Sequence, residues 1–547
     1  MAKSSTQMTA AGIARRIRDG DRSPTEVVEA HLDRIHKRNA RTNVFVMMTD
    51  DLARETAAAA ERAIDDGEPL GPLHGVPIVI KDLANVERVR TTDGSLLFED
   101  RVADADSPFV AWLRSAGTIV VDKANTPEFG LGTTTDDLLV GPTGTPFDPD
   151  RVAGGSSGGA AAALGDSLVP LAPGSDAGGS IRTSASLCSV YGLKPTYGLV
   201  PNVTRPNAFA NHTPLSRNGR IARTVEDAAL SLDVTAGEHP RDPFSIPAWE
   251  EYHAAVDQSI DEMRIAYSPS MGAFPVEPAV REALDDAVSA FERAGATIDE
   301  VDPDLGHDQR GIMSAYYTMA TVRWQSLFGD LEPKGFDPHG EDRDRVRPYL
   351  VDLIMDTEEP TVREYERADV IRTHVSDGLQ GCFEEYDLLV TATLGTTAFP
   401  HGEEHTRIDG VKVEPLRGWV LTQPYNFTGH PAASVPAGFV DGLPVGMQIA
   451  GRRHVDGAMI AANAAFERQR PWHDRYPRRR FGVRYGRSGA RRSRKDYLIR
   501  TTAFPGFHPT VTSLPAERYS PRSVIWRSRL SSRPFDSRTV NFPTLPL

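Results

Sequence analysis

Hydrophobic residues in the first 236 positions fall into short apolar runs and amphipathic stretches that alternate along the chain. The first amphipathic stretch opens at Ser23-Pro24-Thr25-Glu26, a capping box with proline at the first helical position. Val28, Leu32 and Ile35 then recur at helical spacing. This spacing predicts a helix whose buried stripe consists of those three side chains.

Two apolar runs in the same region predict buried strands, Val76–Ile80 and Thr118–Val121. Between them, Val110–Ala116 predicts a helix. A chain in which apolar strands alternate with helices is typical of an α/β fold, because the helices cover the faces of one sheet. We therefore expect an α/β protein.

The middle of the chain has a different pattern. Pro278–Gly295 and the stretch that opens at Thr361-x-x-Glu364 predict long amphipathic helices. The polar residues 329–347 between them predict a surface loop, so residues 300–380 are expected to form helical cover over the sheet. Apolar strands are predicted again in two later runs, Leu388–Val390 and Pro444–Ile449.

Charge divides the 547 residues into two unequal parts. Residues 1–477 hold 45 basic and 72 acidic groups, a net charge of −27, and only seven of the basic groups are lysines. Residues 478–547 hold 15 arginines and one lysine against three acidic groups, a net charge of +13, and lose regular periodicity. An acidic surface repels nucleic acid. The scarcity of lysine favours a halophilic protein over an ordinary acidic one.

Three observations limit the class of protein. No run of 18 apolar residues occurs, so no transmembrane helix and no membrane partner are expected. The segment Met1–Gly20 lacks the apolar core of a secretory signal. Cys188 and Cys382 are too few for a disulfide framework or a cysteine-rich zinc site. We therefore predict a cytoplasmic protein.

Residues 154–192 concentrate glycine and serine to a degree that packing does not require. Gly154–Gly159 is followed by Gly174–Arg182, and paired glycines allow successive backbone N–H groups to point at one ligand. A serine that ends such a nest can act as a nucleophile whose own N–H helps to hold an oxyanion. A plain linker fits less well, because Leu168 and Val169 place an apolar run between the glycines.

Three kinds of site fit this segment to different degrees. A phosphate-binding loop has weak support, because no Gly-Lys-Ser/Thr ending is present. An α/β-hydrolase elbow, which would indicate an esterase, matches Gly154-x-Ser156-x-Gly158. That elbow directly follows a strand, whereas Asp148–Arg151 is polar. The third candidate is a serine hydrolase that uses a lysine as its base.

Lys81 is the candidate base. It ends the apolar run Val76–Ile80, where burial is expected to lower its pKa toward neutrality. A neutral amine is a competent general base. The alternative is an ordinary lysine at a strand end, paired with Asp82. From these residues alone the two interpretations have equal weight.

Several long motifs, in order along residues 8–477, resemble those of the amidase signature family, which includes fatty acid amide hydrolase. The motifs that carry the resemblance are Gly71–Asp82, Gly154–Gly159, Asp176–Arg182, Gly192–Gly198 and Pro431–Gly438. The resemblance implies an amidase signature domain over residues 1–477, with a large mixed β-sheet core covered by helices on both faces. Within it, residues 300–420 would contain the substrate pocket. The Arg-rich residues 478–547 are then predicted to be a disordered or non-family tail.

The resemblance also implies a Ser–Ser–Lys triad. Ser180 would be the nucleophile, Lys81 the base, and Ser156 the bridging serine, with the peptide bond before Ser156 cis. Backbone N–H groups would form the oxyanion hole, from Ala177, Gly178, Gly179 and Ser180. Three further residues would support the loop, Ser157, Asp176 and Arg182. Ser189 departs from the family pattern, which usually has glycine at that position.

The implied activity is hydrolysis of a carboxylic amide to an acid and ammonia or an amine, through an acyl-enzyme. No metal and no organic cofactor are implied, and His401-Gly-Glu-Glu-His405 lacks the spacing of a helical zinc motif. The expected partner is a small-molecule amide substrate, with a homodimer as a candidate assembly. Three aromatic residues are predicted near the acyl pocket, Tyr316, Tyr317 and Trp324.

Two other functions stay open. Lys123–Gly130 resembles the stand-alone amidases more than the amidase-type component of aspartyl/glutamyl-tRNA amidotransferase, which is the main alternative. The acidic body also opposes a tRNA partner. A catalytically silent binding protein is the other alternative, and the intact Lys81, Ser156 and Ser180 argue against it.

Overall fold

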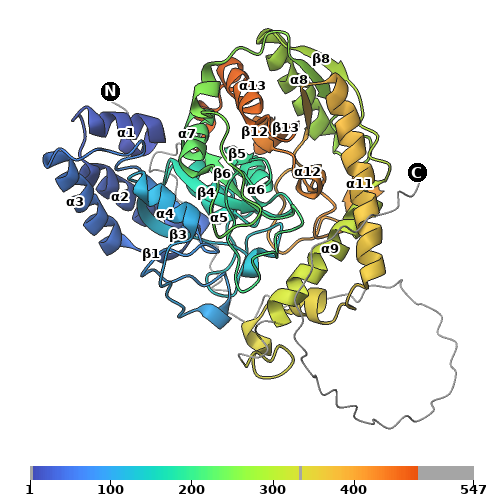
Figure 1. Ribbon diagram of the computed structural model, residues 1–547, viewed down its shortest axis with the longest axis horizontal. Coiled ribbons are helices and arrows are strands. Elements are labelled where there is room, and N and C mark those ends of the chain that lie inside the picture. Colours follow the sequence, from blue (N-terminus) through green and yellow to red (C-terminus); the bar gives the residue numbers. More distant parts are fainter. Residues whose placement is uncertain (1–3, 330, 332–334, 478–547) are drawn as a thin grey trace, which may run out of the picture. The chain divides into compact units, whose positions relative to one another are not determined.

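A computed structural model describes residues 4–329, 331 and 335–477 (Figure 1). The chain divides into two units, Met1–Arg487 and Ser488–Leu547, and the described residues all lie in the first. The predicted tail, residues 478–547, lies outside the described residues.

The strands follow the chain from β1 near the N-terminus to β13. They are β1 (Phe45–Met48), β2 (Pro77–Lys81), β3 (Ile119–Ala124), β4 (Leu171–Asp176), β5 (Tyr191–Lys194), β6 (Arg217–Ala222), β7 (Arg264–Tyr267), β8 (Thr297–Glu300), β9 (Leu388–Ala392), β10 (Arg407–Ile408), β11 (Val411–Lys412), β12 (Ala432–Val440) and β13 (Leu443–Gly451). Eleven of them form one sheet in the order β1-β3-β2-β4-β6-β5-β12-β13-β9-β7-β8.

The sheet is mixed. Strand β2 pairs in parallel with β3 and β4, and β7 pairs in parallel with β8 and β9. The central strands β5, β12, β13 and β9 pair antiparallel. The prediction of an α/β fold built on a large mixed sheet is therefore confirmed.

Helices cover this sheet. They are α1 (Ala10–Arg18), α2 (Pro24–Thr42), α3 (Asp50–Asp65), α4 (Pro108–Ser115), α5 (Gly158–Gly165), α6 (Ser180–Cys188), α7 (Val225–Thr235), α8 (Pro278–Arg293), α9 (Gln309–Gly329), α10 (Pro348–Leu350), α11 (Val362–Glu385), α12 (Gln423–Thr428) and α13 (Asp456–Gln469). Helices α9 and α11 lie side by side, as Figure 1 shows. Within the described residues, no helix combines the length and apolar character needed to cross a membrane.

Local signals in the sequence locate helix starts well. The predicted capping boxes are both present, Ser23 with Glu26 at α2 and Thr361 with Glu364 at α11. The predicted stripe on α2 is also buried, at Val28, Leu32 and Ile35.

Two features differ from the sequence expectation. Strand β12 was not predicted, because Pro436 interrupts an otherwise apolar run and lies at a register shift in the pairing with β13. The predicted surface loop, residues 329–347, ends in the core, because Val346 is buried and the Arg347 N–H donates to Glu128 Oε2 at 2.9 Å.

The helices α5 and α6 are buried along their whole length. Helix α6 packs against the central strands of the sheet and α5 packs against α6. Small residues of the glycine- and serine-rich segment make this close packing possible, because they let helix and sheet backbones approach. At the end of α6, Ser189 takes the left-handed conformation with φ +54°.

Candidate active site

Three neighbouring segments bring the predicted triad together. Lys81 is the last residue of β2, Ser156 lies in the loop before α5, and Ser180 is the first residue of α6. Strands β2 and β4 are parallel neighbours, so their carboxyl ends lie at the same edge of the sheet. The loop from β4 to α6 therefore meets Lys81 at that edge.

The triad side chains form a continuous chain of contacts. Lys81 Nζ donates to Ser156 Oγ at 2.7 Å, and Ser156 Oγ donates to Ser180 Oγ at 2.9 Å. The three residues are 3%, 2% and 6% exposed, respectively. The peptide bond between Gly155 and Ser156 is cis, as the family resemblance implied.

The surroundings of Lys81 distinguish its two interpretations. Asp82 does not pair with Lys81, because its carboxylate lies 2.9 Å from Lys123 Nζ. Burial lowers the pKa of Lys81 to about 7, while the charge of Asp176 opposes this shift. Lys81 is therefore poised between its neutral and protonated forms near neutral pH.

Ser175 is a site residue that the sequence analysis missed. Its hydroxyl accepts a second hydrogen bond from Lys81 Nζ, at 3.0 Å. Ser157, which was predicted to support the triad, instead donates to the Ser175 carbonyl at 3.3 Å. The position of Ser175, directly before Asp176 in the glycine-rich loop, is the signal that could have identified it.

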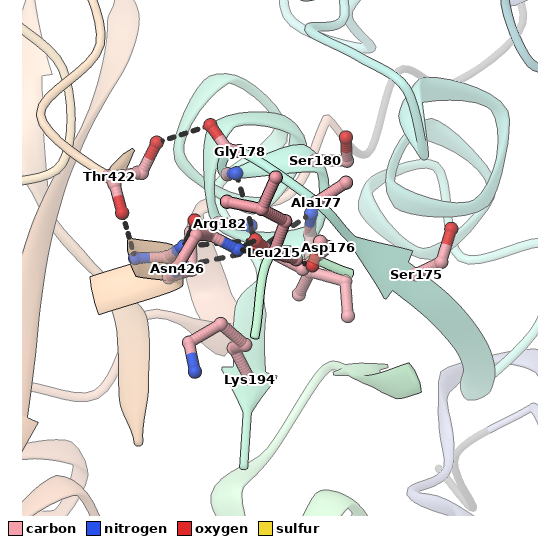
Figure 2. A network of polar contacts seen from close by, with 12 residues as sticks. Ser175, Asp176, Ala177, Gly178, Ser180, Arg182, Lys194, Leu215, Thr422 and Asn426 are labelled. Atoms are coloured by element: carbon pink, nitrogen blue, oxygen red, sulfur yellow. Dashed lines mark hydrogen bonds and ion pairs between the residues drawn. The ribbon is translucent and has the colours of Figure 1, made fainter. Parts of the chain in front are cut away.

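Asp176 and Arg182 form a buried ion pair behind the loop. Figure 2 shows the Arg182 and Asn426 side chains directed at Asp176. Arg182 Nε and Nη2 donate to the two carboxylate oxygens at 3.0 and 2.9 Å. Burial alone would raise the pKa of Asp176, but the Arg182 charge and the hydrogen bonds together hold it below its usual range. Asp176 is therefore ionised.

Arg182 also connects the loop to the C-terminal part of the chain. Its guanidinium donates to the Thr422 carbonyl at 3.1 Å, to Asn426 Oδ1 at 2.6 Å and to Gln448 Oε1 at 2.6 Å. These partners fix the guanidinium plane and hence the orientation of Asp176. The sequence analysis did not identify them, because they lie more than 200 residues away.

Two side chains hold the carbonyl groups of the oxyanion loop. The Tyr316 hydroxyl donates to the Ala177 carbonyl at 3.2 Å, and Thr422 Oγ1 donates to the Gly178 carbonyl at 2.7 Å. The peptide unit is planar and trans, so each N–H points away from the carbonyl of the same unit. The Gly178 N–H is therefore directed away from Tyr316.

The amide groups of this loop do not all stay available. The Gly179 N–H donates to Asp176 Oδ1 at 2.8 Å, which removes one of the four donors predicted for the oxyanion hole. The other three donate to no acceptor within the described part of the chain, namely the N–H groups of Ala177, Gly178 and Ser180. A three-donor nest beside the Ser180 hydroxyl remains.

The predicted aromatic residues lie on α9 beside the same loop. Tyr316 contacts it directly, Tyr317 donates to Glu414 Oε2 at 3.1 Å, and the ring of Trp324 lies 5.8 Å from Arg417 Cζ. Arg417 itself was not identified from the sequence, because its loop has no glycine nest or motif that indicates a site.

This arrangement suits acyl transfer to a serine. A nearly neutral amine contacts one hydroxyl, that hydroxyl contacts a second, and the second lies at a helix start beside free backbone N–H groups. Such a geometry supplies a base, a relay, a nucleophile and donors for a developing oxyanion.

Comparison with known proteins gives consistent results. The amidase family model matches residues 26–460. The chain is 38% identical over 474 residues to an acylamidase of Rhodococcus erythropolis, covering 86% of this chain and 97% of that protein. The crystal structure of a bacterial aryl acylamidase of the amidase signature family matches with a TM-score of 0.83 and 37% identity, covering 86% of this chain and 98% of that one.

A second kind of relative belongs to the glutamyl-tRNA(Gln) amidotransferases. The chain is 33% identical over 480 residues to the amidase-type component of this enzyme from Thermosynechococcus vestitus, covering 84% of this chain and 97% of that protein. Both kinds of relative are therefore aligned over nearly their whole length.

The family match covers most of the chain, and it includes every segment that builds the site. The chain therefore belongs to the amidase signature family, and it is a hydrolase that acts on the C–N bond of carboxylic amides.

Proposed function

We propose that this chain hydrolyses small acyl amides through an acyl-enzyme on Ser180, with Lys81 as the base and Ser156 as the proton relay. The observation that carries the proposal is the unbroken series of contacts from Lys81 Nζ to Ser156 Oγ, at 2.7 Å, and on to Ser180 Oγ, at 2.9 Å. The pKa of Lys81, about 7, provides a neutral amine at working pH.

The chemistry proceeds in two stages. Lys81 accepts a proton from Ser156, which accepts one from Ser180, and Ser180 Oγ attacks the amide carbonyl carbon. The tetrahedral intermediate collapses when the protonated relay returns a proton to the amine nitrogen, and the C–N bond breaks. Water, deprotonated by the same relay, then attacks the ester carbonyl, releases the acid and restores Ser180.

The developing oxyanion needs hydrogen-bond donors. We assign this role to the N–H groups of Ala177, Gly178 and Ser180, and we leave Gly179 out because its N–H already donates to Asp176. Asp176 and Arg182 keep the loop in shape, since their buried ion pair joins the loop to α12 and β13. Such fixed donors stabilise the transition state without reorganisation during the reaction.

A stand-alone amidase is favoured over a component of an amidotransferase. The identity to the acylamidase, 38%, exceeds the 33% to the amidotransferase component over a similar length. The net charge of −27 on residues 1–477 also opposes binding to the tRNA backbone. We accordingly propose a cytoplasmic enzyme with an acidic surface, adapted to salt, that takes small amides and binds no nucleic acid.

Trapping the acyl-enzyme tests this proposal. The purified chain is incubated with linear and aryl acyl amides, and the release of acid and of ammonia or amine is measured. Rapid acid quenching followed by peptide mass spectrometry is expected to find the acyl group on Ser180. Activity that persists in Ser180→Ala, or an acyl group on another residue, would contradict the proposal.

A further inference from the structure

Arg417 lies beside the oxyanion loop and plays no part in the chemistry described above. Its side chain is buried, with 4% of the residue exposed. Its Nη1 lies 3.3 Å from the point that a Cβ on Gly178 would occupy. The rings of Tyr316 and Trp324 flank the guanidinium, with centroids 5.5 and 5.8 Å from Cζ. The cation therefore lies next to the site at which the substrate carbonyl is expected.

The Arg417 guanidinium has no anionic partner within the described residues. Its Nε is buried without a hydrogen-bond acceptor, and no carboxylate lies within ion-pair distance of the side chain. Glu414 is close in sequence, but its carboxylate accepts from the Tyr317 hydroxyl and from the backbone N–H groups of Leu416 and Arg417. Glu414 is thus held by other donors.

The neighbouring charges do not neutralise Arg417 either. Asp176 is paired with Arg182 at 2.9 Å. Burial raises the pKa values of Tyr316 and Tyr317, so both hydroxyls are neutral near pH 7. Arginine stays protonated at this pH. The result is a buried positive charge without compensation at the edge of the active site, an arrangement that is costly unless a ligand supplies the anion.

We propose that Arg417 binds a carboxylate group of the substrate, so that the enzyme prefers amides that carry a carboxylate, such as monoamides of dicarboxylic acids. This inference rests on the proposed function. A planar guanidinium recognises a carboxylate through two parallel hydrogen bonds. Gly178 contributes by its lack of a side chain, because a Cβ there would collide with the Tyr316 hydroxyl and narrow the space beside Arg417.

A purely structural role for Arg417 makes a different prediction. If the cation only packs between the rings of Tyr316 and Trp324, its removal lowers stability and slows neutral and anionic substrates equally. A binding role instead changes the selectivity between the two. The ratio of kcat/KM for matched substrates separates these outcomes, and a loss of folded protein does not affect that ratio.

The experiment compares matched amides in the full chain. Succinamate is compared with butyramide and glutaramate with valeramide, which place the carboxylate on the acyl side. N-acetylglycine is compared with N-ethylacetamide, which places it on the amine side. We expect the wild type to favour the anionic member of the best pair by about 10–100-fold in kcat/KM, the range for hydrogen bonds to a charged group.

Three variants complete the test. Arg417→Met is expected to abolish the preference and Arg417→Lys to retain part of it. Arg293→Met, on the exposed face of α8, is the matched control and is expected to keep the preference. Equal kcat/KM for the members of every pair in the wild type would overturn the inference, as would a preference that survives in Arg417→Met.

Failure of the proposed function is distinguishable from failure of this inference. If the wild type hydrolyses no amide, the proposed function fails and carboxylate binding is judged by calorimetric titration with glutarate. Binding by the wild type and by Arg293→Met, with about 10–100-fold weaker binding by Arg417→Met, supports the inference. Absent binding, or equal binding by Arg417→Met, overturns it.

Discussion

Asp82 forms its ion pair with Lys123, at 2.9 Å, and not with the adjacent Lys81. Both partners are buried, and Lys123 is further held by the Ala84 carbonyl and the Thr91 hydroxyl, each at 2.8 Å. A carboxylate paired with Lys81 would favour its protonated form. The Asp82–Lys123 pair removes that influence and leaves the Lys81 amine to the two serines.

The pH dependence of activity tests the state of Lys81. Because a base must be neutral to accept a proton, kcat/KM is expected to rise with pH through about 7, the lowered pKa of Lys81, and to level off above it. Below that pKa the rate is expected to fall about tenfold per pH unit. Lys81→Ala is expected to lose most of the rate and this rise. A profile that is unchanged in Lys81→Ala would contradict the assignment.

The two serines are expected to differ in the cost of their removal. Ser180→Ala removes the nucleophile and is expected to lower kcat by on the order of 10⁴–10⁶-fold. Ser156→Ala removes only the relay and is expected to cost about 10²–10⁴-fold, because Lys81 or a water can partly replace it. Steady-state kinetics with circular dichroism as the folding control measure both. Equal losses in the two variants would contradict the division of roles.

Arg182→Met is expected to destabilise the fold. The substitution leaves the Asp176 carboxylate buried without its cation, which typically costs about 3–5 kcal/mol. Arg182→Lys keeps the charge but loses the fork that reaches Asn426 and Gln448, so a smaller loss is expected. Thermal unfolding measures both variants. An unchanged melting temperature in Arg182→Met would show that the pair does not support the loop.

Ser189→Gly is expected to stabilise the protein by about 1 kcal/mol. Ser189 follows α6 in the left-handed conformation, and its buried hydroxyl has no partner among the described residues. Glycine adopts this conformation without steric cost and removes the hydroxyl. The control is Ser289→Gly within the exposed face of α8, which is expected to lower the melting temperature. A lower melting temperature in Ser189→Gly would refute the prediction.

Salt is expected to raise the melting temperature. The net charge of −27 on residues 1–477 implies self-repulsion, which weakens as the Debye length falls from about 30 Å at 0.01 M salt to about 3 Å at 1 M. Lys81, Lys123 and Lys194 are buried and add no positive charge to the surface. Calorimetry in dilute buffer and in 1 M potassium chloride measures the effect. A flat or falling melting temperature would contradict a salt-adapted surface.

The sequence predicted the features that depend on nearby residues. The capping boxes at Ser23 and Thr361 involve contacts across three positions, and both are present. The paired glycines likewise marked the loop that ends at Ser180, because close backbone approach needs glycine wherever the chain folds. Local chemistry therefore identified helix starts and the glycine-rich part of the site.

Features that depend on distant residues could not be predicted in this way. Nothing near Lys81 indicates that Lys123 takes its neighbouring carboxylate, and nothing near Asp176 indicates Asn426. Arg417 reaches the loop only because α9 and the segment before α12 fold against it. Long-range packing decides these contacts, and one sequence carries no direct record of it.

The pairing of β5 with β12 has a consequence for synthesis of the chain. Strand β5 ends at Lys194, and its partner begins at Ala432. Until that partner leaves the ribosome, β5 presents an open sheet edge, which invites pairing with other chains. At about 5–20 residues per second, the roughly 240 intervening residues keep this edge open for about 10–50 s. Slow translation of the helical middle region would therefore favour aggregation of the nascent chain.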